Sequence, residues 1–177
     1  MSIRGKTLAF LLAILMAAHP AAAKDDPSIE VAFSPHRGGT EAIVKLITEA
    51  KQTIRVAAYS FTSKDIAQAL IEAHKRGVDV EAVLDKSNAT AKYTSATFLA
   101  NEGMPTRIDY QYAIMHNKFM VVDGVTVETG SFNYTKAAEE HNAENVLVLR
   151  NAPEVAKQYL ARWQELWNES EDYEAKY

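Results

Sequence analysis

The stretch that decides the fold is His116-Asn-Lys-Phe-Met-Val-Val-Asp-Gly124, which Gly130-Ser-Phe-Asn133 follows a few residues later. Its centre, Phe119 to Val122, is apolar and typical of a short buried strand. Asp-Gly is a favoured two-residue hairpin turn, and an alternating segment resumes at Val125. The stretch therefore predicts a β-hairpin that carries polar residues at the ends away from its turn.

A two-residue turn would place Val122 opposite Val125 and His116 opposite Ser131. Side chains alternate between the two faces of a strand, so this register puts several polar residues on one face. These residues are His116, Lys118, Thr129, Ser131 and, in a chain that stays extended, Asn133. Directly opposed Cβ atoms lie about 4.5 to 5.5 Å apart, so the register predicts a polar cluster. Asp123 is an odd number of residues from His116, so it falls on the opposite face, and we expect it to hold the turn or to pair with a basic residue.

The spacing HxKxxxxD of His116, Lys118 and Asp123, with the Gly-Ser and Asn133 that follow, resembles the signature of the phospholipase D superfamily of phosphodiesterases. A single copy of this motif in a short chain is most similar to the small bacterial endonucleases of that superfamily. Many members have two residues between the serine and the asparagine, whereas here Phe132 alone separates them.

The resemblance implies a metal-independent, two-step displacement at phosphorus without a cofactor. One histidine forms a phosphohistidine, and a second protonates the leaving alkoxide and then activates water. Lys118, Ser131 and Asn133 would donate to the phosphate oxygens. The family's carboxylate that orients the histidine corresponds to Glu144. The expected catalytic residues are therefore His116, Lys118, Asp123 and Glu144, with no metal site.

This mechanism needs two histidines, and the chain has one motif. The other histidines do not repeat it: His19, His36, His74 and His141. A homodimer with its twofold axis through the site would supply a second His116 and Lys118. We therefore expect a homodimer that completes the active site, with DNA and also RNA as substrate.

Residues 1–23 are typical of a secretory signal peptide. Arg4 and Lys6 precede an apolar segment at 7–18, and Ala21-Ala-Ala23 is a small-residue cleavage site. An uncleaved membrane anchor is the alternative interpretation. Residues 24–177 then form a single phosphodiesterase domain, exported to the periplasm or exterior of a bacterium. The absence of cysteine in the sequence excludes disulfides and thiolate metal sites.

The net charge of −4 is unfavourable for long-range attraction to nucleic acid. The acidic residues concentrate at 165–174, so the local potential can differ from the net charge. Several cations fall in or near predicted loops: Arg37, Lys86, Lys92, Lys118 and Lys136.

Strands alternate with helices along the chain, which predicts an α/β fold. The expected strands are 29–33, 53–60, 78–84, 106–110, the hairpin and 144–150. The expected helices are 40–51, 63–77, 90–101 and a long one opened by Pro153. This order predicts a phospholipase D-like mixed, largely parallel sheet with helices on both faces.

Several alternatives stay open at this point. A phospholipase D-type lipid phosphodiesterase would share the chemistry, but we identify no amphipathic insertion helix and no long loop with exposed aromatics. A non-catalytic phosphate-binding module and a metallohydrolase are the other classes. Glu144 could simply face water, and His36-Arg-Gly-Gly39 could contact phosphate or only form a turn. Trp163 and Trp167 are four residues apart, which favours packing over base stacking.

Overall fold

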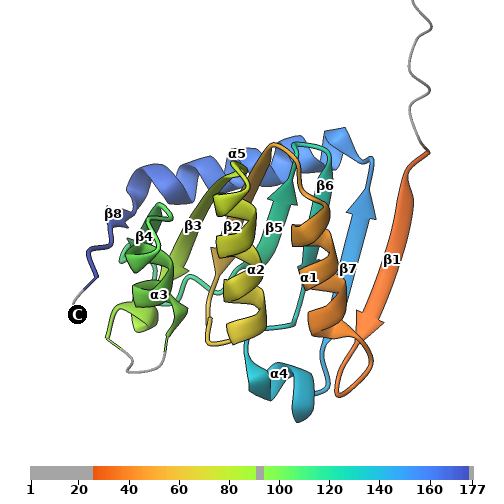
Figure 1. Cartoon of the computed structure of the whole chain (residues 1–177), viewed down its shortest axis with the longest axis horizontal. Helices are drawn as coiled ribbons and strands as arrows, with labels where there is room; N and C mark the ends of the chain where they lie inside the picture. The colour runs from red at the N-terminus through yellow and green to blue at the C-terminus, as the bar shows by residue number, and fades with distance from the viewer. Residues whose placement is uncertain (1–25, 91–93, 176–177) are drawn as a thin grey trace, which may run out of the picture.

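The computed structural model describes residues 26–90 and 94–175 (Figure 1), so the expected signal peptide lies outside the described residues. The described residues form one eight-stranded sheet. Its strands are β1 (Ser28–Phe33), β2 (Thr53–Ala58), β3 (Asp79–Asp85), β4 (Thr106–Asp109), β5 (Lys118–Val122), β6 (Thr126–Gly130), β7 (Asn145–Arg150) and β8 (Glu171–Asp172). Within the same residues, no helix is long and apolar enough to cross a bilayer.

The helices are α1 (Gly39–Glu49), α2 (Lys64–Lys75), α3 (Ser95–Asn101), α4 (Lys136–Glu140) and α5 (Pro153–Glu169), with a 3₁₀ turn at Lys86–Ala89. Ser63 caps α2, because its side chain accepts the N–H of Ile66. The predicted strands and the helices predicted at 40–51, at 63–77 and after Pro153 are confirmed to within a few residues. The helix predicted at 90–101 is present at Ser95–Asn101, and residues 91–93 of that prediction lie outside the described residues. The short elements α4, β8 and the 3₁₀ turn carry too little periodic pattern to be found from sequence.

The sheet has the order β1-β7-β6-β5-β2-β3-β4-β8. In the described part of the chain, the β2–β3 and β3–β4 pairs are parallel and the other pairs are antiparallel. The expectation of a largely parallel sheet was therefore wrong. β1 and β2 run in the same direction, but the β5–β6 hairpin and β7 lie between them. This insertion replaces a parallel contact by antiparallel ones, and local sequence does not specify it.

Helices cover both faces of the sheet, as predicted (Figure 1). Helices α1, α2 and α3 bury one apolar cluster against the first face. Helix α5 crosses the other face and buries a second cluster, which includes Trp163 and Phe119. Trp163 donates to the carbonyl of Val56 at 2.9 Å and stacks on Trp167 at 4.9 Å between centroids. The tryptophan pair is therefore packing, as its spacing predicted.

The hairpin is present, but its register differs by one residue from the prediction. Val122 pairs with Thr126 and Phe119 with Thr129, so the loop has three residues. Asp123 N–H donates to the Thr53 carbonyl at 2.9 Å, which extends the pairing with β2. The extra loop residue is Val125, whose carbonyl accepts from Ala152 at 2.8 Å.

The register shift turns Thr129 toward the face that α5 covers, because Thr129 lies two residues beyond Val127 of the second cluster and residues two apart in a strand share a face. Lys118 pairs with Ala58, which belongs to the first cluster. Thr129 and Lys118 therefore do not share a face, and the polar cluster cannot arise from simple strand alternation. His116 and Ser131 lie just outside the paired strands, so the directions of their side chains need not alternate as they do within a strand.

Candidate active site

The candidate site lies at the edge of the sheet where β5 and β7 begin and β6 ends. His116 lies two residues before β5, Ser131 directly follows β6, and Glu144 directly precedes β7. Since β5, β6 and β7 are antiparallel neighbours, these three ends meet at one edge. The fold thus brings together motif residues that the sequence separates.

His116 and Lys118 are in direct contact. Lys118 Nζ lies 3.0 Å from His116 Nδ1 and donates to the His116 carbonyl at 2.8 Å. An ammonium group can only donate, so Nδ1 is the acceptor and a neutral ring carries its proton on Nε2. The exposed His116 ring packs against Tyr59 at 4.5 Å between centroids. Nε2 is consequently the ring nitrogen that is not engaged by Lys118.

Lys118 is 7% exposed, which is unusual for a lysine. Burial lowers the pKa of the Lys118 ammonium below its ordinary 10.5, and the charge of Glu144 opposes this shift. The ammonium also lies 5.3 Å from the Tyr59 ring centroid, where the negative face of the ring attracts it. A buried cation with few fixed partners is suited to donate to an incoming anion.

Ser131 and Glu144 form the second contact of the site. Ser131 Oγ donates to Glu144 Oε2 at 2.6 Å and accepts the N–H of Asn145 at 3.1 Å. The other carboxylate oxygen, Glu144 Oε1, accepts from Asn142 at 3.0 Å. The structure therefore holds Glu144 against serine and asparagine, and not against the His116 ring as the resemblance implied.

Asn133 lies two residues beyond Ser131 and is half buried. Its Oδ1 is buried and has no hydrogen-bond partner among the described residues. Its carbonyl accepts the N–H of Thr135 at 2.6 Å, and Thr135 caps α4. The structure thus places Asn133 on the same segment as Ser131 without fixing its amide on another site residue.

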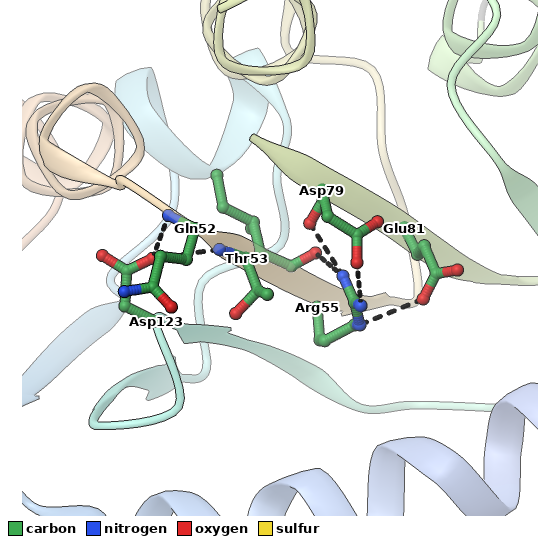
Figure 2. Close-up of polar contacts among 7 residues, drawn as sticks. Gln52, Thr53, Arg55, Asp79, Glu81 and Asp123 are labelled. Atoms are coloured by element: carbon green, nitrogen blue, oxygen red, sulfur yellow. Dashed lines mark hydrogen bonds and ion pairs between the residues drawn. The ribbon is translucent and has the colours of Figure 1, made fainter. Parts of the chain in front are cut away.

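Asp123 lies at the opposite end of β5 from His116. Its Oδ1 accepts the N–H groups of Gln52 at 2.7 Å and Thr53 at 3.0 Å (Figure 2). Its Oδ2 accepts the N–H of Lys51 at 3.0 Å. A five-residue strand is about 16 Å long, so Asp123 cannot touch a phosphate bound at His116. Its inclusion among the catalytic residues is therefore corrected: its contacts hold the turn and the connection into β2.

Sequence reasoning missed Tyr59 and Asp85. Tyr59 follows β2 and supports both His116 and Lys118 through its ring. Asp85 is 2% exposed, and its Oδ2 accepts the N–H of Met115 at 2.8 Å, one residue before His116. A polar residue directly after a buried apolar strand was the signal for Asp85. Tyr59 had no signal beyond its position at a strand end.

The loop that leads into His116 also differs from expectation. Tyr110, Tyr112 and Ile114 are exposed within it, whereas we expected no loop with exposed aromatics. Lys86 donates to the Tyr112 carbonyl at 2.9 Å, and the Arg162 guanidinium lies 5.2 Å from the Tyr112 ring centroid. Two of the cations in or near predicted loops are thus held by the protein: Lys86 by this carbonyl, and Lys136 by Glu140 at 3.3 Å. Lys92 lies outside the described residues.

The structure described here brings no group of three or more His, Asp or Glu residues together at metal-binding distance. His141 lies 3.8 Å from Glu140. The chemistry that the site offers is that of an exposed imidazole, a buried ammonium, a hydroxyl and an amide. These groups provide a nucleophile and donors for an anion.

Comparison with known proteins agrees with this chemistry. Residues 43–167 match the family described as the phospholipase D-like domain of cardiolipin synthase. A phospholipase D of Rickettsia bellii is 39% identical over 135 residues, which cover 76% of this chain and 67% of that protein. A mitochondrial cardiolipin hydrolase of Xenopus tropicalis is 32% identical over 127 residues, 72% of this chain and 60% of that protein. The chain therefore belongs to the phospholipase D superfamily, and it is a phosphodiesterase of that class, as the motif predicted.

Among solved structures, the chain is similar to Nuc of Salmonella typhimurium, a phospholipase D family member. The two are 45% identical with a TM-score of 0.82, over 84% of this chain and 99% of Nuc. NucT of Helicobacter pylori has a TM-score of 0.74 at 22% identity, over 84% of this chain and 100% of NucT, and shows the fold alone. The chain thus spans nearly all of Nuc but only about two thirds of the Rickettsia protein.

Proposed function

We propose that this phosphodiesterase is a metal-independent endonuclease that cleaves DNA, and also RNA, through a phosphohistidine on His116. The observation that carries the proposal is the contact between the His116 ring and the buried Lys118 ammonium. The match to Nuc along nearly its whole length supports a nucleic-acid substrate over a lipid. Ser131 and Asn133 are the further donors that the proposal assigns to the phosphate.

The first step follows from the ring geometry. His116 Nε2 attacks phosphorus, and the bond to the leaving oxygen breaks as a second histidine donates a proton to that oxygen. In the second step water attacks phosphorus, gives its proton to the second histidine and releases His116. For Nε2 to carry a lone pair, the ring proton must reside on Nδ1, which requires Lys118 to turn from Nδ1 to the phosphate. The Glu144 carboxylate, which acts electrostatically on Lys118, is the group that would then accept from Nδ1.

The second histidine is proposed to come from a second copy of the chain. An apolar strip supports this: Ile29, Val31 and Phe33 of β1 are 69%, 53% and 49% exposed. Leu149 and Leu147 lie opposite Ile29 and Val31 in β7, on the face of the sheet whose other strands α5 covers. The strip ends at Phe33, opposite Asn145, beside the Ser131 contact. An isologous contact along this strip would bring two catalytic edges together and bury the strip.

The first experiment measures plasmid nicking by the purified chain in excess EDTA, beside His116→Ala and the control His74→Ala. His74 is half buried on α2, away from the site. We expect nicking by the wild type and His74→Ala and none by His116→Ala. Nicking that requires added Mg²⁺ would refute the metal-independent mechanism. Mass spectrometry of acid-sensitive phosphate on a His116 peptide, after a rapid quench, tests the intermediate.

Subunit mixing tests the shared site. An equal mixture of wild type and His116→Ala, allowed to exchange subunits, contains about one quarter wild-type pairs, because symmetric pairs form at random. We expect about one quarter of the activity of an equal total amount of wild type. A site complete within each subunit would instead give one half, and that result would refute the shared site.

A second candidate function, lipid phosphodiester hydrolysis, is favoured by the exposed Tyr110, Tyr112 and Ile114 beside the site. Relatives named phospholipase D and cardiolipin hydrolase agree with it. Cardiolipin vesicles assayed in parallel with plasmid decide between the two. If lipid is the substrate, Ile114→Asp should lower vesicle cleavage much more than cleavage of a soluble diester, because a carboxylate opposes insertion among acyl chains.

We also propose that the chain acts outside the cytoplasm, in the periplasm or beyond. The basic, apolar and small-residue segments of 1–23 support export. Fractionation of bacteria that express the full chain, with N-terminal sequencing of the exported form, tests this. A mature protein that begins at Lys24 is expected, and retention of residues 1–23 in the membrane fraction would contradict it.

A further inference from the structure

Two fully buried polar side chains, Glu128 and Tyr134, flank the segment that carries Ser131 and Asn133. Tyr134 Oη donates to Glu128 Oε2 at 2.6 Å. The other oxygen, Glu128 Oε1, is buried and has no hydrogen-bond partner in the described part of the chain. In such an apolar environment the single hydrogen bond between the pair is strong, and its loss is costly.

The pair joins two separate parts of the fold. Glu128 lies in the middle of the sheet, where β6 pairs with Met120 of β5. Tyr134 is tied to the connection between β2 and α2, because its carbonyl accepts the N–H groups of Thr62 at 2.9 Å and Ser63 at 2.8 Å. The hydrogen bond therefore fixes the distance between the sheet and this connection.

The segment between them is held at both ends. At its start, a Cβ on Gly130 would lie 2.1 Å from the carbonyl oxygen of Asn145, so the two backbones are in close contact. The N–H of Ser131 donates to that carbonyl at 3.2 Å. At its end, Tyr134 is anchored to Glu128. The positions of Ser131 and Asn133 relative to the sheet edge follow from these two anchors.

We propose that Glu128 and Tyr134 are positioning residues for the phosphodiesterase reaction, whose hydrogen bond sets the placement of Ser131 and Asn133 against His116. This inference rests on the proposed role of Ser131 and Asn133 as phosphate donors. A displacement of about 1 Å in such a group can lower the rate about 100-fold, so one remote hydroxyl has a measurable effect.

The protonated form of Glu128 maintains the arrangement. Burial raises the pKa of Glu128 from 4.5 to about 8, and the hydrogen bond from Tyr134 opposes this rise. Burial raises the pKa of Tyr134 well above its ordinary 10, so the phenol stays neutral beside it. Tyr134 is the one titratable group that acts on Glu128 among the described residues, and the facing Met120 and Val148 are apolar. Ionisation of Glu128 therefore places an uncompensated negative charge in the apolar interior next to the segment that carries Ser131 and Asn133.

The test uses bis(p-nitrophenyl) phosphate, a diester with neither nucleoside nor acyl chain, so it does not depend on the natural substrate. Tyr134→Phe is expected to lower kcat about 10- to 100-fold and to change KM less than about threefold. The control Thr106→Val also removes a buried hydroxyl, which donates to Met104 at 3.0 Å at the opposite edge of the sheet. It should destabilise the fold to a similar degree with kcat unchanged. Wild-type kcat in Tyr134→Phe, or an equal loss in both variants, would overturn the proposal.

Glu128→Gln keeps the test decisive if Tyr134→Phe does not fold, because glutamine retains the acceptor and cannot ionise. The ratio of its kcat to that of the wild type cancels the ionisations that both proteins share. We expect this ratio to be near one at pH 6.5 and to rise several-fold above about pH 8, where the wild-type Glu128 ionises. A ratio that stays constant to pH 9 would contradict the positioning role.

Discussion

Asp123→Ala is expected to destabilise the fold while the folded protein keeps its rate of catalysis. Asp123 accepts the N–H groups of Gln52 at 2.7 Å and Thr53 at 3.0 Å (Figure 2) and that of Lys51 at 3.0 Å. Its φ of 52° lies in the left-handed region, which aspartate and asparagine tolerate better than alanine. The residue belongs to the signature motif, so this variant separates a motif residue that holds the backbone from one that contacts phosphate.

The magnitude follows from the exposure of each partner. The N–H groups of Lys51 and Gln52 are exposed, so water replaces the carboxylate there at a cost of about 0.5 kcal/mol each. The N–H of Thr53 is half buried, and its loss costs about 1 to 2 kcal/mol. Alanine at positive φ adds about 1 kcal/mol. The sum of about 3 to 4 kcal/mol lowers the Tm by about 6 to 16 °C for a domain of this size.

The assay combines thermal unfolding by circular dichroism with kcat at 20 °C on bis(p-nitrophenyl) phosphate. Asp123→Asn keeps an acceptor oxygen and tolerates the left-handed conformation, so its Tm should fall by less than half as much. Lys118→Ala provides the contrast, because loss of a phosphate donor should lower kcat by about 100- to 1,000-fold. An Asp123→Asn variant with unchanged Tm and a kcat at least 100-fold lower would refute the reasoning.

Three further predictions concern stability and the sheet edge. Glu128 binds a proton more tightly in the folded than in the unfolded chain. The free energy of unfolding should therefore fall by about 1 kcal/mol per pH unit as the pH rises from 4.5 to about 8. Urea titrations should show this slope in the wild type and a shallower slope in Glu128→Gln. Gly130→Ala should lower both Tm and kcat, because its Cβ would displace Asn145 and with it Ser131. The control Gly103→Ala, which has open space for a Cβ, should lower Tm alone. Equal kcat values in the two variants would contradict this prediction. Trp163→Phe should lower the free energy of unfolding by about 1 to 3 kcal/mol, because the buried Val56 carbonyl loses its hydrogen-bond donor. A difference below about 0.5 kcal/mol in the same urea titration would show that this hydrogen bond does not stabilise the fold.

The sequence predicted which segments form strands and long helices, because their periodic apolar pattern is local. It also predicted that His116 and Lys118 lie together, since they are only two residues apart in the chain, although His116 lies just before β5 and not within it. It did not predict the insertion of the β5–β6 hairpin and β7 between β1 and β2, because strand order depends on packing between distant segments. A local turn preference predicted a two-residue loop, whereas the loop has three residues and its first residue, Asp123, donates to Thr53 of the neighbouring strand, a contact with a distant segment that local preference does not specify.

The partners of the site residues were predictable only in part. Ser131 and Glu144 lie together because β6 and β7 are neighbours, a pairing that the motif does not specify. The same holds for Tyr59, which reaches His116 from the end of β2. The spacing of the motif thus predicted candidate residues of the site, whereas their hydrogen-bond partners depend on which strand ends the fold brings to the same edge.

The position of β1 has a consequence for the order of assembly. Its ladder runs from Ser28 with Arg150 to Phe33 with Asn145, so the first strand of the described chain pairs with a strand near its other end. We expect strand pairs between such distant segments to form late in folding, because closing the long loop between them costs conformational entropy before the pairing gains any free energy. We therefore expect the apolar strip of β1 and β7 to be completed after the rest of the sheet has formed. If the proposed dimer forms through this strip, each chain would acquire its own core before it presents that surface.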